Sequence, residues 1–211
     1  KWVMGIMIFL IGFSRIALGV HFISDVLLGW TVGLLLVWIL ARNMTKLGKN
    51  LMNMPMKFQL LMVALSSGLM ILLPVLVRAL SPGWQLPAEW VQRAGPIDPM
   101  NLEFSLTLAG LWLGFLGGFV LLMHQKGILQ SNHGTWQKIV RYLIGMAGVI
   151  VLYAGLGALF PDDISLPGMV LRFVRYALIG LWVSWGSPLL FEKMSVGVIK
   201  PYLPPQTTAA K

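Results

Sequence analysis

Three side chains that could do chemistry together lie near the start of the chain: Arg15, His21 and Asp25. His21 and Asp25 are four residues apart, so on a helix they would share a face. The carboxylate could then accept a hydrogen bond from one imidazole nitrogen. Such a bond fixes the tautomer and leaves the other nitrogen free and more nucleophilic. Arg15 does not deprotonate and offers a planar fork of donors that suits phosphate.

The positions of these groups require a break in the backbone. On an ideal helix the step from Arg15 to His21 is a rotation of about 600°, so the two side chains would point in directions about 120° apart. The two side chains therefore converge only if the backbone bends between them, and Gly19 is the candidate for that bend. A plainer interpretation stays open from residue types alone. Arg15 would then extend to lipid headgroups, while His21 and Asp25 would cap and orient a helix.

The composition indicates which elements carry these residues. Of the 211 residues, 57% are hydrophobic and only 11% are charged, and the mean hydropathy is +0.81. A soluble domain usually carries about 25% charged residues. These values exclude a water-soluble enzyme, a disordered tail and a fibrous repeat. The absence of cysteine excludes disulfides, thiolate metal sites and cysteine nucleophiles.

The apolar runs predict an all-α, polytopic transmembrane bundle of one partial and five full spanning helices. The run Trp2–Phe13 covers only about 18 Å of a hydrocarbon core of about 30 Å. We interpret it as the end of a helix that begins upstream, with a signal-like segment as the alternative. Because the runs are continuous rather than alternating, a β-barrel is excluded. The five full spans are expected at Val26–Ala41, Phe58–Leu80, Phe104–Met123, Ile139–Phe160 and Val170–Leu190.

The loop charges predict an orientation. If the five helices alternate, one side holds Arg42, Lys46, Lys49, Lys57, Lys126, Lys138, Arg141, Lys193, Lys200 and Lys211. The opposite side holds the acids Glu89, Asp98, Glu103, Asp162 and Asp163, with Arg78, Arg93, Arg172 and Arg175. The positive-inside rule puts the first side in the cytoplasm. We therefore expect an integral protein of a bacterial inner membrane, with the segment around His21 facing the periplasm.

Two further features of the spans lead to expectations. Pro74 should kink or terminate its helix, and glycines on adjacent helices should let backbones approach closely. The arginines of the outer side could form a basic surface for an anionic lipid headgroup. The alternative is that they extend to the interface and pair with Asp162 and Asp163.

The segment Ser14–Trp30, SRIALGVHFISDVLLGW, closely resembles the third signature motif, S-R-x5-H-x3-D, of the type 2 phosphatidic acid phosphatase superfamily. The resemblance implies that His21 is the nucleophile, that Asp25 holds and charge-stabilises its imidazole, and that Arg15 binds phosphoryl oxygens. Ser14 matches the motif and would belong to the substrate-binding residues. No metal and no cofactor are implied. Phe22-Ile23 departs from the commoner Tyr-Pro at positions that are not chemical.

The resemblance covers only part of the family's pattern. The motifs K-x6-R-P and P-S-G-H do not occur in the 211 residues. The nearest imitation, Ser131–Gly134, follows the third motif, lacks the proline and falls on the cytoplasmic side, so we reject it. We expect the chain to be the C-terminal part of a longer protein and to be nearly inactive alone. The predicted divisions are the end of the phosphatase core at 1–41, a basic cytoplasmic linker at 42–57, a four-helix module of unknown role at 58–190 and a cytoplasmic tail at 191–211.

The sequence therefore predicts a membrane lipid phosphate phosphatase that hydrolyses a phosphomonoester or pyrophosphate through a phosphohistidine. Its partners would be the lipid phosphate substrate and membrane lipids, with no nucleic acid. A phosphotransferase would use the same intermediate. The alternatives are a transporter-like module, against which the nearly uncharged helix interiors argue, and a non-catalytic scaffold that retains the motif.

Overall fold

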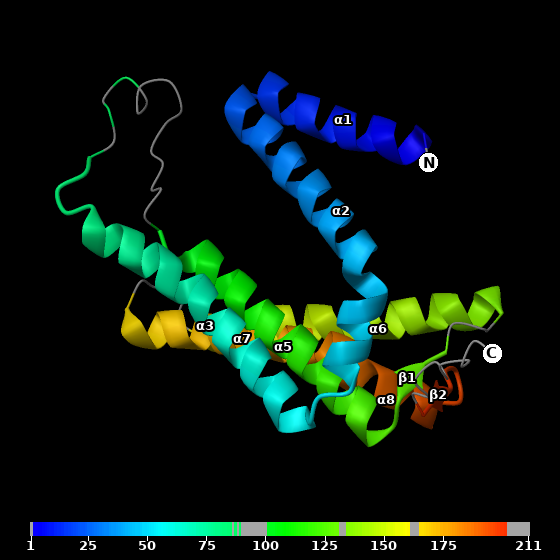
Figure 1. Cartoon of the computed structure of the whole chain (residues 1–211). Helices are drawn as coiled ribbons and strands as arrows, with labels where there is room; N and C mark the ends of the chain where they lie inside the picture. The colour runs from blue at the N-terminus through cyan, green and yellow to red at the C-terminus, as the bar shows by residue number, and fades with distance from the viewer. Residues whose placement is uncertain are drawn as a thin grey trace. The chain divides into compact units, whose positions relative to one another are not determined.

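The computed structural model describes residues 2–85, 87, 89, 101–130, 134–160 and 165–201, without the side chains of 44–46 and 49 (Figure 1). The described chain is helical apart from two short strands. Its helices are α1 (Trp2–Ala17), α2 (Ile23–Met52), α3 (Met56–Leu80), α5 (Glu103–Gln125), α6 (Thr135–Leu159), α7 (Leu166–Leu181), the π-helix η1 (Trp182–Gly186) and α8 (Ser187–Lys193). The strands are β1 (Ile128–Leu129) and β2 (Ile199–Lys200).

Five segments are long and apolar enough to cross a membrane: Ile23–Asn43, Met56–Leu80, Glu103–Gln125, Thr135–Leu159 and Leu166–Lys193. The apolar helix Trp2–Ala17 is shorter. The predicted all-α bundle of one partial and five full spans is therefore confirmed. Large apolar side chains cover the outside of these helices, as expected where lipid rather than water is the surrounding solvent.

The chain forms two compact units, whose first boundary lies between Asn53 and Met54. The first unit contains α1 and α2, and the second contains α3 and the elements from α5 onward. Pro55 explains the break between α2 and α3, because a residue before proline is driven out of the helical region. The predicted linker at 42–57 is helical as far as Met52. Its role as a division between functional domains stays a prediction.

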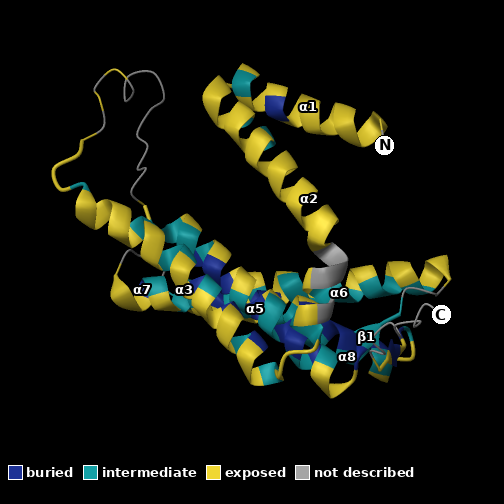
Figure 2. Ribbon diagram, viewed as in Figure 1, coloured by how far each residue is buried: buried dark blue, intermediate teal, exposed yellow. Residues whose placement is uncertain are grey.

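The second unit is built around α5, which contains many of its buried residues (dark blue in Figure 2). Close backbone contact joins α5 to α7. A Cβ atom added at Gly180 would lie 2.6 Å from the carbonyl oxygen of Leu111, and one added at Gly114 would overlap the carbonyl of Ala177. Small residues of this kind let helices approach in a membrane, where lipid provides no hydrophobic drive for association. The predicted packing role of the glycines is confirmed at Gly114.

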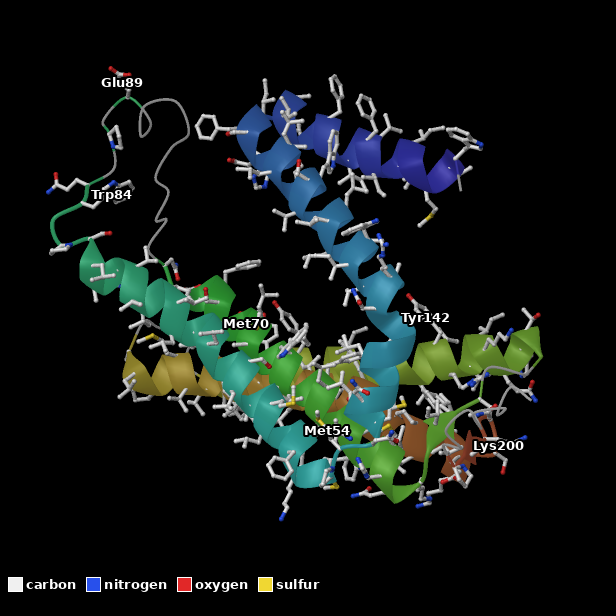
Figure 3. The ribbon with its side chains drawn as sticks, viewed as in Figure 1. Met54, Met70, Trp84, Glu89, Tyr142 and Lys200 are labelled. Atoms are coloured by element: carbon white, nitrogen blue, oxygen red, sulfur yellow. The ribbon has the colours of Figure 1, made fainter. Side chains whose placement is uncertain are left out.

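Side-chain hydrogen bonds add to this packing. The Ser67 hydroxyl donates to the Ala109 carbonyl at 2.8 Å, and the Trp182 indole donates to the Gly145 carbonyl at 3.0 Å. Lys126, after the end of α5, pairs with Glu192 on α8. Lys200 (Figure 3) lies on β2, where it aligns with Ile128 on β1. These contacts tie α8 and the segment after it to the end of α5.

Two features of the helices depart from the sequence-based expectation. Pro74 was expected to kink or terminate its helix, and termination does not occur, because α3 runs through Pro74 to Leu80. Proline inside a spanning helix is tolerated because neighbouring groups satisfy the backbone atoms that it frees. The predicted span Val170–Leu190 is interrupted by η1, a π-helical segment that the apolar run does not reveal. The ring of Trp182, the first residue of η1, lies where a side chain at Gly148 would be.

Replacing Gly114 by alanine should destabilise the second unit by about 1–3 kcal/mol, because the new methyl group overlaps the α7 backbone. Gly117→Ala is the matched control on the same helix, since nothing lies within 4 Å of a Cβ atom there. Unfolding of both variants would be followed by circular dichroism in micelles on addition of a denaturing detergent. Equal stability of the two variants would contradict the proposed backbone contact.

Candidate active site

The turn after α1 is held by two backbone hydrogen bonds around a left-handed glycine. Gly19 has φ +69°. Its N–H donates to the Ile16 carbonyl at 3.0 Å, and the Val20 N–H donates to the Arg15 carbonyl at 3.2 Å. This pair of bonds is the Schellman C-cap, in which a left-handed residue satisfies the last carbonyls of a helix. The bend predicted at Gly19 is present, and it lies between Arg15 and His21.

Asp25 lies in the first turn of the following helix, α2. Its Oδ2 accepts a hydrogen bond from the Phe22 N–H at 3.1 Å, and its Oδ1 accepts one from the Ser24 hydroxyl at 3.4 Å. A carboxylate in the third helical position that binds the N-cap N–H is half of a capping box. It also places negative charge where the helix dipole is positive. Asp25 therefore has a structural role at the start of α2, as the plainer interpretation of the sequence expected.

The same carboxylate faces His21. His21 Nδ1 lies 3.7 Å from Asp25 Oδ2, which is close enough for an ion pair with a protonated ring but too long for a hydrogen bond. His21 precedes the first turn of α2, so the two residues do not share a helical face, and this expectation is wrong. The physical reason is the cap. Asp25 binds the N–H of Phe22, so α2 begins only after Phe22, at Ile23. The side chains of His21 and Asp25 are about half exposed, at 46% and 49%.

Arg15 lies in the last turn of α1 and is exposed. Within the described ranges no hydrogen bond or ion pair involves its guanidinium group, so its donors face the surroundings. The Ser14 hydroxyl donates to the Ile11 carbonyl at 2.8 Å. Its proton is therefore engaged within α1, and its predicted place among the substrate-binding residues stays a prediction.

Gly12 lets α1 pack closely against α2. The sequence alone does not single out this glycine. It is the buried residue of α1. A Cβ atom at Gly12 would lie 2.9 Å from Val26 Cγ1 and overlap the Trp30 ring. The Trp30 ring also lies 6.1 Å from the Phe9 ring, between centroids. In the sequence, Gly12 is visible only as a glycine inside an apolar run. Such a glycine indicates close helix packing only when the partner helix is known.

The arginines of the predicted outer side have different surroundings in the structure. Arg172 Nη2 lies 3.1 Å from Glu103 Oε2, whereas Arg78 is exposed at the end of α3. Arg93, Asp162 and Asp163 lie outside the described residues, and so does the rejected Ser131–His133 segment. In the part of the chain that the structure describes, no group of three or more histidine, aspartate and glutamate side chains could hold a metal ion.

Comparison with known families matches two separate parts of the chain. Residues 1–49, which contain Arg15, His21 and Asp25, match the PAP2 superfamily. Residues 106–198 match the family described as PAP2 superfamily phosphatase, transmembrane extension. This second match assigns a family to helices that the motif around His21 does not cover. Neither the curated proteins nor the solved structures gave a match. The segment that carries the phosphatase motif and the segment that carries the later spanning helices are thus each similar to the PAP2 superfamily, the second to the transmembrane extension of its phosphatases.

Proposed function

We propose that the chain carries part of the active site of a lipid phosphate phosphatase in which His21 is the nucleophile. The observation that supports this most is the single helix–turn–helix around Gly19. It carries Arg15 at the end of α1 and a half-exposed His21–Asp25 pair at the start of α2. These three residues lie within the segment that matches the PAP2 superfamily. A nucleophile, a group that orients it and a phosphate-binding cation are the parts that such a reaction needs.

In the proposed reaction Nε2 of neutral His21 attacks phosphorus, because Nδ1 is the nitrogen that faces Asp25. A P–N bond forms while the P–O bond to the lipid breaks, and the lipid oxygen leaves with the bonding electron pair and takes up a proton. Water then attacks the phosphohistidine, and inorganic phosphate leaves as the P–N electrons return to the imidazole. Asp25 stabilises the positive charge that the ring carries between these steps, as a buried or half-buried carboxylate does beside histidine. Arg15 would bind the phosphoryl oxygens.

The position of the motif supports a lipid substrate. His21 lies two residues before the spanning segment Ile23–Asn43, so it would lie at the membrane–water interface, at the level of lipid headgroups. A phosphomonoester or pyrophosphate on a lipid reaches this level without leaving the bilayer. The positive-inside rule favours the outer, periplasmic face of a bacterial inner membrane. A hydroxyl acceptor in place of water would make the same intermediate serve phosphotransfer.

The isolated 211-residue chain should release phosphate slowly, because neither K-x6-R-P nor P-S-G-H occurs in it. A missing general acid alone lowers rates by about 10²–10⁴-fold. Phosphate liberated from phosphatidic acid in mixed micelles by the purified chain would measure this. Rapid release would show that other residues of this chain protonate the leaving group and bind the phosphate.

His21→Ala should abolish turnover, by about 1,000-fold or more, since the residue that forms the covalent intermediate is removed. The assay is release of ³²P from labelled phosphatidic acid by membranes that contain the protein expressed from its complete gene. Acid-labile, alkali-stable label on the protein would report the phosphohistidine. His124→Ala is the matched control, because His124 is an exposed histidine at the end of α5. Unchanged turnover in His21→Ala would refute the assignment, whatever His124→Ala does.

Asp25→Asn separates the two roles of the carboxylate. Asparagine keeps a side-chain oxygen for the Phe22 N–H but loses the charge beside His21. We expect turnover to fall by about 10²–10⁴-fold while thermal stability changes little. Full activity in this variant would mean that Asp25 serves only as the helix cap.

A further inference from the structure

Arg175 is a buried cation inside the second unit. It lies on α7 and is only 8% exposed. Its guanidinium carbon lies 5.4 Å from the ring centre of Tyr153 on α6 and 5.2 Å from that of Tyr176. The two rings are 6.4 Å apart and tilted by 62°. Two aromatic rings therefore contact one guanidinium group, which is a favourable but uncharged environment for a cation.

The charge of Arg175 is not matched within the described part of the chain. Its Nε is buried and has no hydrogen-bond partner, and no carboxylate there pairs with its guanidinium group. Arg175 lies nine residues into α7, about 14 Å along the helix from Leu166. An ionisable side chain at such a depth marks a ligand or transport site more often than a structural one.

On one side Arg175 packs against a glycine of α6. A Cβ atom added at Gly157 on α6 would lie 3.0 Å from Arg175 Nη1, so any larger residue at this position would press on the guanidinium group. One turn before Arg175, Arg172 adds a second cation, which lies beside Glu103 at 3.1 Å. Among the described residues here, these three charged side chains sum to a net charge of +1, which favours an anion.

We propose that the transmembrane extension binds a phosphate-bearing anion at Arg175. A guanidinium group offers a planar set of donors that matches the oxygens of phosphate, and its unpaired Nε–H is one of them. The tyrosine rings hold the cation without neutralising it, so the bound anion would supply the missing charge. The proposal concerns α6 and α7 and does not depend on the chemistry of His21.

The test uses the full 211-residue chain in maltoside micelles, which contain no phosphate. Thermal unfolding would be measured alone and with inorganic phosphate, phosphatidic acid or oleate. Phosphatidic acid should raise Tm by about 5 °C at saturation, and Arg175→Gln should lose this shift. Arg78→Gln is the matched control, an exposed arginine in the same unit, and should keep it. Any part of the shift that comes from the site at His21 would be lost in Arg15→Gln instead, which separates the two sites.

The arms of the experiment distinguish the source of the phosphate. A shift with phosphatidic acid alone identifies a lipid headgroup, and an additional shift with inorganic phosphate shows that the phosphate group suffices. An equal shift in the wild type and in Arg175→Gln would overturn the proposal, as would a shift with oleate only or no shift with any probe.

A second pair of variants covers the case in which Arg175→Gln does not fold. Gly157→Leu would press on Arg175 Nη1, which lies 3.0 Å from the Cβ position, and should lower the affinity for phosphatidic acid at least tenfold. Gly155→Leu, on the same helix with nothing within 4 Å of its Cβ position, should leave the affinity unchanged. Lipid retention by native mass spectrometry would report both affinities. Equal affinity in the two variants would refute a site next to Gly157.

Discussion

The left-handed turn at Gly19 determines where every candidate catalytic group lies. Without it, α1 would continue, and Arg15 and His21 would point to different faces of one helix. A residue with a Cβ atom in this conformation costs about 1–2 kcal/mol, whereas glycine adopts it freely. The turn also ends the intrahelical hydrogen bonds of α1 at the carbonyls of Arg15 and Ile16. The polar groups of the site therefore lie at helix ends, where exposed backbone atoms do not have to be satisfied inside lipid.

Asp25 shows how one carboxylate can serve the fold and the chemistry. Its Oδ2 accepts the Phe22 N–H at 3.1 Å and lies 3.7 Å from His21 Nδ1. A negative charge at a helix N-terminus contributes about 0.3–1 kcal/mol when exposed, so the cap contributes only modestly to the stability of the fold. The proposed chemistry gains more from the same charge, because the ring becomes positive only after phosphoryl transfer. The cap fixes the carboxylate before the charge appears, which is the arrangement that electrostatic stabilisation requires.

The sequence predicted the spans and the Gly19 bend because apolar length and glycine geometry are local properties. The expected span Val26–Ala41 already left His21 outside the helix. The shared helical face considered for His21 and Asp25 does not form, since the i,i+4 spacing gives no sign of where a cap starts the helix. Gly12 and η1 were missed for a related reason. Their roles depend on Trp30 and Gly148, which lie on other helices, and packing partners are not encoded by spacing along one segment. Pro74 was overestimated as a helix terminator because the rule from soluble helices is weaker in lipid.

Arg175 poses an energetic question that the packing alone does not answer. A charged side chain costs about 2.5–3.5 kcal/mol at the centre of a spanning helix on insertion scales, and Arg175, nine residues from the start of α7, carries part of this cost. One cation–π contact returns about 0.5–2 kcal/mol, and the two contacts with Tyr153 and Tyr176 share a single guanidinium group. The unpaired Nε adds about 1–3 kcal/mol of desolvation cost. An apolar residue of similar size would avoid both costs, since buried charges are often replaceable by well-packed apolar groups without loss of stability. The packing of α7 therefore gains nothing from the charge itself, whereas a bound phosphate would turn the same charge into an attraction.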